Sequence, residues 1–176
     1  MRLKSVSNIA KITKSMKMIA GTKVTRAQKA MEQARIYGAA SSAIYKHVEL
    51  PVMAAPLLVA CSSDRGLCGG IHSSVTKAIK KEQLKTPSSL IAILGQKSRA
   101  QLQRTHKSSI ALSFDGVTKF NASWYESALI GDVILGQKIK ADGFKVVYNQ
   151  FKSVIAYLPA TILVPSKTVI EQRIFH

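Results

Sequence analysis

Acidic side chains are scarce in this chain of 176 residues, in which 9 Asp and Glu stand against 26 Lys and Arg. The formal net charge is therefore +17. A field of that sign favours an acidic partner, which can be nucleic acid, an anionic membrane surface or an acidic protein surface. Hydrophobic residues nevertheless make up 47% of the chain, which is enough to build a core and argues against global disorder.

The sequence also lacks the marks of a membrane-spanning, secreted or metal-binding protein. No apolar run approaches the ~20 residues that cross a bilayer, and the basic N-terminus has no secretory signal pattern. Cys61 and Cys68 are too few for a disulfide scaffold, and Cys68 with His72 four residues later is too small a set for a metal. We therefore expect two buried thiols in a reducing compartment, with no metal and no cofactor.

Proline is absent from residues 3–48, and this segment reads as one long helix. Small and apolar residues recur there at steps of three and four, which is typical of a coiled-coil seam, with a stutter between Met16 and Val24. The seam consists of Ile9, Ile12, Met16, Ala20, Val24, Ala27, Met31, Ala34 and Gly38. Such a helix is roughly 65–70 Å long. No later segment matches it, so we expect its partner to lie outside the chain as given.

After Pro56 the pattern changes to short apolar runs that alternate with amphipathic segments. The expected strands are 57–61, 89–94, 109–114 and 145–148, with a further antiparallel strand at 151–157. The expected helices are 71–84, 96–103 and 122–140. This alternation predicts a small Rossmann-like α/β domain with a mostly parallel sheet covered on both faces. The expected organisation is a helix at 1–49, a linker at 50–56, an α/β domain at 57–165 and a tail at 166–176.

Three stretches resemble the gamma subunits of mitochondrial-type ATP synthases. Residues 2–20 (RLKSVSNIAKITKSMKMIA) look like the N-terminal shaft helix of that family. Residues 62–74 (SSDRGLCGGIHSS) are similar to the turn that opens the first helix of its α/β domain, and residues 147–157 (VYNQFKSVIAY) resemble the closing strands. The three stretches also occur in the family's order and spacing, which makes the resemblance strong.

The resemblance implies a long antiparallel coiled coil of N- and C-terminal helices with an α/β domain at its foot. It implies a non-catalytic rotor that couples proton-driven rotation to ATP synthesis at the beta subunits. The implied partners are the alpha and beta subunits and, through the foot domain, delta/epsilon-type stalk subunits and the membrane c-ring. The implied location is peripheral, on the matrix side of the mitochondrial inner membrane.

The resemblance also assigns partner-binding residues. Lys11, Lys14 and Lys17 would pass acidic loops of the beta subunits. Exposed ion pairs contribute about 0–1 kcal/mol each, so such contacts can form and break during rotation. Met16 would supply a flexible apolar bearing surface. Arg65, followed by Gly66, would touch an acidic beta loop. From the residues alone, a solvated lysine face and a methionine packed in the seam are the favoured interpretations, and Arg65 can equally pair with Asp64 or face solvent.

Two other functions stay open from the residues. A strand, a glycine-bearing turn and a helix can cradle phosphate, but the turn at 62–70 matches neither nucleotide-binding motif and no catalytic set accompanies it. The net charge also permits nucleic-acid binding. Against it, the N-terminal segment carries only Tyr37 and Tyr45 as aromatics, and its seam favours a helical partner.

The chain stops at His176 without the family's C-terminal helix, so the resemblance is to a C-terminally truncated gamma subunit. We expect the seam of the first helix to need a separate copy of that helix or another protein, and the isolated helix to fray or self-associate. A non-functional fragment is the remaining alternative.

Overall fold

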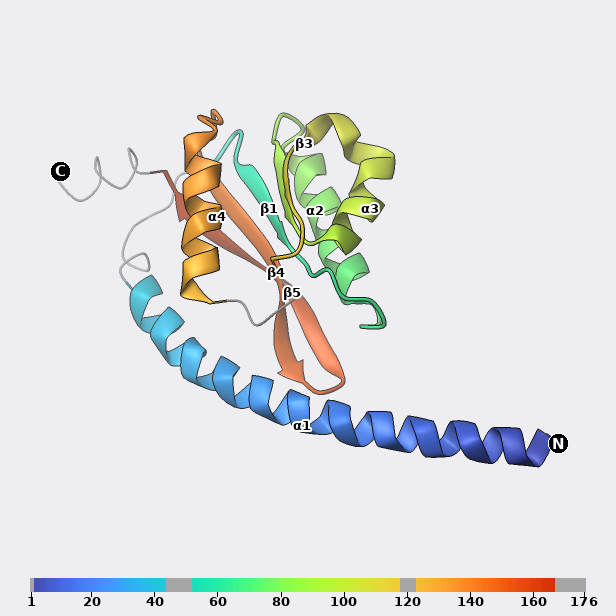
Figure 1. Ribbon diagram of the computed structural model, residues 1–176. Helices are drawn as coiled ribbons and strands as arrows, with labels where there is room; N and C mark the ends of the chain where they lie inside the picture. Colours follow the sequence, from blue (N-terminus) through green and yellow to red (C-terminus); the bar gives the residue numbers. More distant parts are fainter. Residues whose placement is uncertain (1, 44–51, 118–122, 167–176) are drawn as a thin grey trace. The chain divides into compact units, whose positions relative to one another are not determined.

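The computed structural model describes residues 2–43, 52–117 and 123–166, and the chain divides into two compact units, Met1–Glu49 and Leu50–His176. The helices are α1 (Arg2–Ser42), α2 (Ile71–Lys85), α3 (Gln96–His106), the short 3-10 helix η2 (Lys107–Ser109) and α4 (Trp124–Gly136). The strands are β1 (Leu57–Cys61), β2 (Ile91–Leu94), β3 (Ile110–Phe114), β4 (Gly143–Ser153) and β5 (Ala156–Pro165). The predicted fold class, a long N-terminal helix and a mostly parallel sheet, is confirmed (Figure 1).

Helix α1 is 41 residues long and buries none of them. At ~1.5 Å per residue it extends for about 60 Å. Its predicted seam is exposed, with Ile9 and Ile12 at 60% and Met16 at 64% of their full accessible area. The predicted end of the helix at residues 44–48, the first two positions of the predicted linker and the predicted tail from residue 167 lie outside the described residues.

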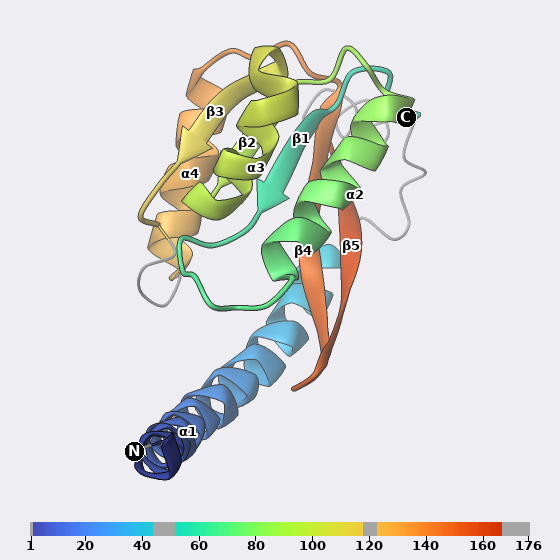
Figure 2. The same cartoon turned by 90° about the vertical axis from the view of Figure 1, so that its right-hand side faces the viewer.

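The sheet has the strand order β3-β2-β1-β4-β5. Strands β1 to β4 are parallel, and β5 is antiparallel to β4. The chain runs outward from β1 to β3 and then returns to β4 on the other side of β1. This reversal places α2 and α3 on one face of the sheet and α4 on the opposite face, as Figures 1 and 2 show.

The core lies on both sides of β1. Leu58 and Ala60 point to the layer under α2 and α3, which is sealed by Val75, Ile79, Ile91, Ile93, Leu102 and Val147. Leu57 and Val59 point to the layer under α4. A strand covered on both faces must be apolar at every position, which is why LLVAC reads as a continuous run rather than as an alternation.

The last two strands differ from the prediction. Residues 151–157 do not form one strand: β4 continues to Ser153, Val154 and Ile155 form the turn, and β5 runs antiparallel from Ala156 to Pro165. The turn carries no Gly, Asn or Pro, so nothing in the sequence marked it. Pro159 and Pro165 lie within β5, which is an edge strand, where a missing N–H donor is tolerated.

Helix α4 packs loosely on its face of the sheet. The N–H and the hydroxyl of Ser123 both donate to the carboxylate of Glu126, which fixes the first turn of the helix and lowers the pKa of Glu126. Ile134 is the only buried residue of α4. An apolar cavity of about 550 Å³ lies beneath the helix and is lined by residues that include Ile130, Phe144 and Val146.

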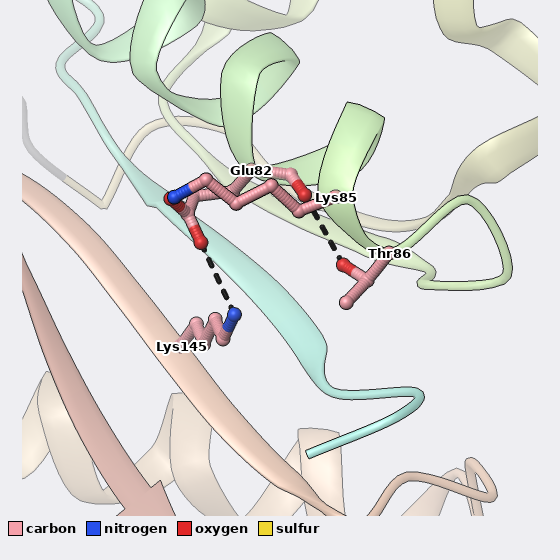
Figure 3. Close-up of polar contacts among 4 residues, drawn as sticks. All are labelled: Glu82, Lys85, Thr86 and Lys145. Carbon is pink, nitrogen blue, oxygen red and sulfur yellow. Dashed lines mark hydrogen bonds and ion pairs between the residues drawn. The ribbon is translucent and has the colours of Figure 1, made fainter. Parts of the chain in front are cut away.

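A partly buried charge cluster joins α2 to the sheet (Figure 3). The Lys145 Nζ of β4 donates to Glu82 Oε2 at 3.1 Å, and the two side chains are only 15% and 16% exposed. The Lys85 Nζ donates to the other oxygen of Glu82 at 2.6 Å, and the hydroxyl of Thr86 donates to the Glu82 carbonyl at 3.2 Å. The hydrogen bonds from Lys85 and Lys145 outweigh burial and lower the pKa of Glu82.

We predict that Glu82→Gln lowers the free energy of unfolding by about 1–3 kcal/mol at pH 7, because it leaves the ammonium of Lys145 partly buried without its counter-charge. The folded-state pKa of Glu82 lies below its ordinary value of 4.5. Its contribution is therefore complete above that value and disappears as the pH falls through the lowered folded pKa. Urea unfolding at pH 7 and pH 3 measures both effects.

The matched control is Lys85→Gln, because the Lys85 side chain is 59% exposed and an exposed pair contributes at most about 1 kcal/mol. Equal losses in the two variants, or a loss in Glu82→Gln that persists unchanged at pH 3, would contradict the assigned role.

Candidate partner-binding site

The N-terminal three quarters of α1 carry positive charge only. Residues 2–31 contain eight Lys and Arg, and the first carboxylate of the chain is Glu32. Lys11, Lys14 and Lys17 are all exposed, as is Met16 at 64%. Steps of three residues on a helix give neighbouring side chains, so these lysines form one slanted stripe. This surface can attract carboxylates while offering exposed apolar side chains beside them.

The loop at residues 62–70 leaves the carboxyl end of β1 and is fixed by one carboxylate. Asp64 Oδ1 accepts the N–H of Gln96 at 2.9 Å, at the start of α3, and Oδ2 accepts the N–H of Gly116 at 3.1 Å, after β3. Hydrogen bonds from backbone N–H groups to an ionised carboxylate are stronger than hydrogen bonds between neutral groups. Asp64 therefore joins the loops that follow three parallel strands.

Close backbone contact holds the same loop against β2. Gly95 has φ +97°, and a Cβ placed there would lie 2.7 Å from the backbone N and C of Ser63. Both the left-handed conformation and the lack of space require glycine at this position. The backbone of the loop consequently sits directly on the end of β2.

His72, at 7% exposure, ties the loop to the first turn of α2. Its Nε2 lies 2.9 Å from the carbonyl of Arg65 and its Nδ1 lies 2.9 Å from the hydroxyl of Ser62. Because a carbonyl only accepts, Nε2 carries a proton and donates to it, and the hydroxyl of Ser62 is the hydrogen-bond partner of Nδ1. Both ring nitrogens thereby have a hydrogen-bond partner, and the backbone of Arg65 is held in place.

The loop displays its outermost residues to solvent. Arg65, Gly66 and Leu67 are all exposed, and Leu67 adopts a left-handed φ of 59°. A Cβ built on Gly66 would lie 3.9 Å from the Nζ of Lys97, so the ammonium of Lys97 lies close to the 62–70 loop. The result is a basic side chain on a backbone that the rest of the domain holds fixed.

The predicted site residues thus fall into two groups. Lys11, Lys14, Met16 and Lys17 belong to the first unit, and Arg65 and Gly66 belong to the second. The sequence placed Asp64 beside Arg65 as a possible ion-pair partner, and the structure shows that the carboxylate of Asp64 binds the backbone N–H groups of Gln96 and Gly116. It also missed the loop-fixing roles of His72 and Gly95. A glycine directly after a predicted strand was the available signal for Gly95.

The two cysteines do not form a shared site. Cys68 precedes α2, and its thiol lies 3.1 Å from the Gly66 carbonyl, whereas His72 binds Ser62 and Arg65. The predicted buried thiols are only partly buried as residues. Burial against the layer under α4 still raises the pKa of the Cys61 thiol to about 11. Cys61 is therefore protonated and unreactive at neutral pH.

The described part of the chain shows neither a metal-binding cluster nor a membrane-spanning helix. Residues 2–43, 52–117 and 123–166 hold no group of three or more His, Cys, Asp or Glu side chains placed to bind a metal. In the same ranges no helix combines the length and the apolar character that crossing a membrane requires.

Comparisons with known proteins agree with the resemblance in the sequence. A family model described as ATP synthase matches residues 1–173. The chain is 40% identical to the mitochondrial ATP synthase subunit gamma of Pichia angusta, over 97% of this chain and 64% of the relative. It is 39% identical to the rat mitochondrial ATP synthase F(1) complex subunit gamma, over 89% of this chain and 60% of the relative. The chain therefore spans about three fifths of these relatives' length.

Solved structures give the same result. The chain is similar to a chain from the central stalk and c-ring of the Tetrahymena thermophila mitochondrial ATP synthase, with a TM-score of 0.75 and 25% identity. The match covers 90% of this chain and 74% of that one. A chain from the Euglena gracilis mitochondrial ATP synthase shares the fold at 13% identity and a TM-score of 0.59, covering 82% and 54% of the two chains.

We predict that Asp64→Ala lowers the free energy of unfolding by about 1–2 kcal/mol, because two backbone donors lose a charged acceptor. The amide hydrogens of Gln96 and Gly116 should exchange with solvent faster in the variant than in the parent chain, whereas those in the interior of β1 should be affected less. Urea unfolding measures the loss of stability, and hydrogen exchange measures the rates at the two amides. Asp132→Ala, at an exposed position of α4, is the control and should change stability by less than about 0.5 kcal/mol. Unchanged exchange at Gln96 and Gly116 would refute the assignment.

Proposed function

The chain belongs to the ATP synthase gamma-subunit family, and from this we propose that it acts as a non-catalytic part of the central stalk. In this role α1 turns within a ring of alpha and beta subunits and couples proton-driven rotation to ATP synthesis at the beta subunits. Its place is peripheral, at the matrix side of the mitochondrial inner membrane.

The observation that carries the proposal is the exposure of α1. A helix of 41 residues with no buried residue gains little stability from propensity alone, since helices in proteins depend on packing. Its seam at Ile9, Ile12 and Met16 is more than half exposed. A seam of this kind needs a helical partner, which we propose is the C-terminal helix of the family.

The charge distribution of α1 supports contact with acidic surfaces of a surrounding ring. The stripe of Lys11, Lys14 and Lys17 lies in a stretch without any carboxylate, so it must find its counter-charges elsewhere. Exposed ion pairs are individually weak and are screened by salt. Weak pairs suit a rotating contact, because each can be broken and remade at little cost.

Arg65 extends this contact to the α/β domain. The guanidinium is always charged and matches a carboxylate with two parallel donors. The bonds of Asp64 and His72 hold the backbone of Arg65, so little conformational entropy is lost when it meets an acidic loop. We propose that Arg65, with Gly66 next to it, meets a beta subunit.

Exposed apolar side chains of the α/β domain support contacts with the other stalk components. In the turn between β4 and β5, Val154 is 71% exposed and Ile155 is 94% exposed. On α4, Trp124 is 77% exposed and Tyr125 is 73% exposed. Large apolar residues of this kind are typical of interfaces. We propose that these surfaces meet delta/epsilon-type stalk subunits and the c-ring.

The test is reconstitution of the full chain with alpha and beta subunits that lack their own gamma subunit. We expect native mass spectrometry to detect a complex of the chain with the alpha–beta ring, and we expect nucleotide hydrolysis by that ring to change. A separate peptide carrying the family's C-terminal helix should strengthen the complex, because it covers the seam of α1. Failure to assemble even with this peptide would refute the stalk role and favour nucleic-acid binding.

We predict that the triple variant Lys11→Glu, Lys14→Glu, Lys17→Glu weakens this complex at least tenfold at low salt, because it reverses the charge of the stripe. As the salt concentration rises, the affinities of the variant and the parent chain for the alpha–beta ring should become more similar, because salt screens the charges of the stripe. Titration by native mass spectrometry at two salt concentrations measures this effect.

The control changes the net charge equally at exposed lysines of the other unit, with Lys107→Glu, Lys140→Glu and Lys152→Glu. It should leave the affinity for the alpha–beta ring within about threefold. An equal loss in both triple variants would show that net charge matters and that the position of the stripe does not.

A further inference from the structure

Basic side chains line a groove between α2 and α3, on the face of the sheet opposite α4. The groove has a volume of about 440 Å³. Its walls are formed by Ser73, Thr76, Lys77 and Lys80 of α2 and by Ala100, Gln101, Arg104 and Thr105 of α3. Three of these residues are cations, four others carry hydrogen-bonding groups and none is acidic. Its composition is therefore that of an anion site.

The groove follows from the helical period. The α2 residues are spaced i, i+3, i+4 and i+7, so they form one stripe along that helix. The α3 residues form a shorter stripe that faces it. The α2 stripe is only about 10 Å long, at ~1.5 Å per residue. A compact anionic group fits this length better than a nucleic-acid duplex or an extended acidic peptide does.

The three cations of the groove have no acidic partner in the described part of the chain. The ion pairs there join Lys85 and Lys145 to Glu82, and Arg99 to Asp115. Lys80 is half-buried as a residue, and no carboxylate of the described residues pairs with its ammonium. An anion in the groove would compensate this charge, which favours binding.

The polar groups on the groove walls leave a donor available. Ser73 Oγ accepts the Nε2–H of Gln101 at 3.3 Å, so its own O–H can donate to a ligand. Thr76, at 4% exposure, lies at the base of the groove, and its hydroxyl donates to Ser98 Oγ at 3.5 Å, so its proton is already used within the domain. The groove therefore combines an exposed guanidinium and two ammonium groups with the hydroxyl of Ser73 as a further donor.

We propose that this groove binds a phosphate-bearing anion, such as an oligophosphate or the head group of a phospholipid. Several oxygens and up to two charges on one phosphate match a guanidinium fork, ammonium groups and a hydroxyl in a short groove, whereas a carboxylate offers only two oxygens and one charge. The site shares no residue with the α1 stripe or the 62–70 loop, and it does not depend on the proposed stalk role.

The experiment titrates the full chain with sodium tripolyphosphate by isothermal titration calorimetry at moderate salt, with citrate as the carboxylate comparison. We expect binding with 1:1 stoichiometry and a dissociation constant below 1 mM, and at least tenfold weaker binding of citrate. The variant Lys80→Gln, Arg104→Gln should weaken tripolyphosphate binding at least tenfold. Lysine, arginine and glutamine have similar helix propensities, so α2 and α3 should keep their structure.

The matched control is Lys81→Gln, Lys107→Gln, which removes the same charge from exposed positions outside the groove. It should change the affinity less than threefold. Equal weakening by the two double variants, or equal binding of citrate and tripolyphosphate, would overturn the proposal and leave only general attraction to a basic chain. Tighter binding of a DNA duplex that depends on Lys80 and Arg104 would also overturn it, in favour of nucleic acid.

A second arm identifies the source of the phosphate. The chain is mixed with vesicles of phosphatidylglycerol and phosphatidylcholine, or of phosphatidylcholine alone, and sedimented. Sedimentation that requires phosphatidylglycerol and is lost in the groove variant, but not in the control variant, supports a lipid head group. Tripolyphosphate binding without vesicle binding supports a free phosphate compound. The absence of both would refute the site.

Discussion

The α/β domain depends on the burial of β1 on both of its faces. Leu58 and Ala60 face the layer under α2 and α3, and Leu57 and Val59 face the layer under α4. Fully burying one such aliphatic side chain contributes roughly 1.5–3 kcal/mol. Because β1 pairs with β2 on one side and β4 on the other, its carboxyl end lies at the reversal of the strand order. The loop that carries Arg65 begins at this point, where parallel sheets commonly place functional groups.

Carboxylates in this domain mainly serve its internal structure. Asp64 and Asp142 accept backbone N–H groups, at Gln96 and Gly116 and at Ala54 and Ala55 respectively. Glu82 and Asp115 pair with basic side chains, and Glu126 binds Ser123. With only nine acidic residues in the chain, this use leaves most of the positive charge uncompensated. The excess is available to acidic partners, and both the α1 stripe and the α2–α3 groove present it.

Local patterns were sufficient for much of the fold. The absence of proline and the three-and-four spacing predicted α1, and the LLVAC run predicted β1 with its observed bounds. Prediction failed at β5, where Pro159 and the apolar turn at Val154 and Ile155 gave misleading local signals. An edge strand accepts proline because one side of its backbone has no hydrogen-bonding partner to lose. That circumstance depends on the neighbouring strands, so it is absent from the local sequence.

The sequence by itself determined the fold class, the family and the excess of basic residues, because periodicity, motif order and composition are properties of the chain read in one dimension. Only the tertiary structure decided what the polar residues do. Asp64 holds Gln96, 32 positions later, and Gly116, 52 positions later. Lys145 reaches Glu82 across 63 positions. The α2–α3 groove joins residues that lie far apart in the chain. Such long-range pairings arise when helices pack on a common sheet, and no local pattern encodes them.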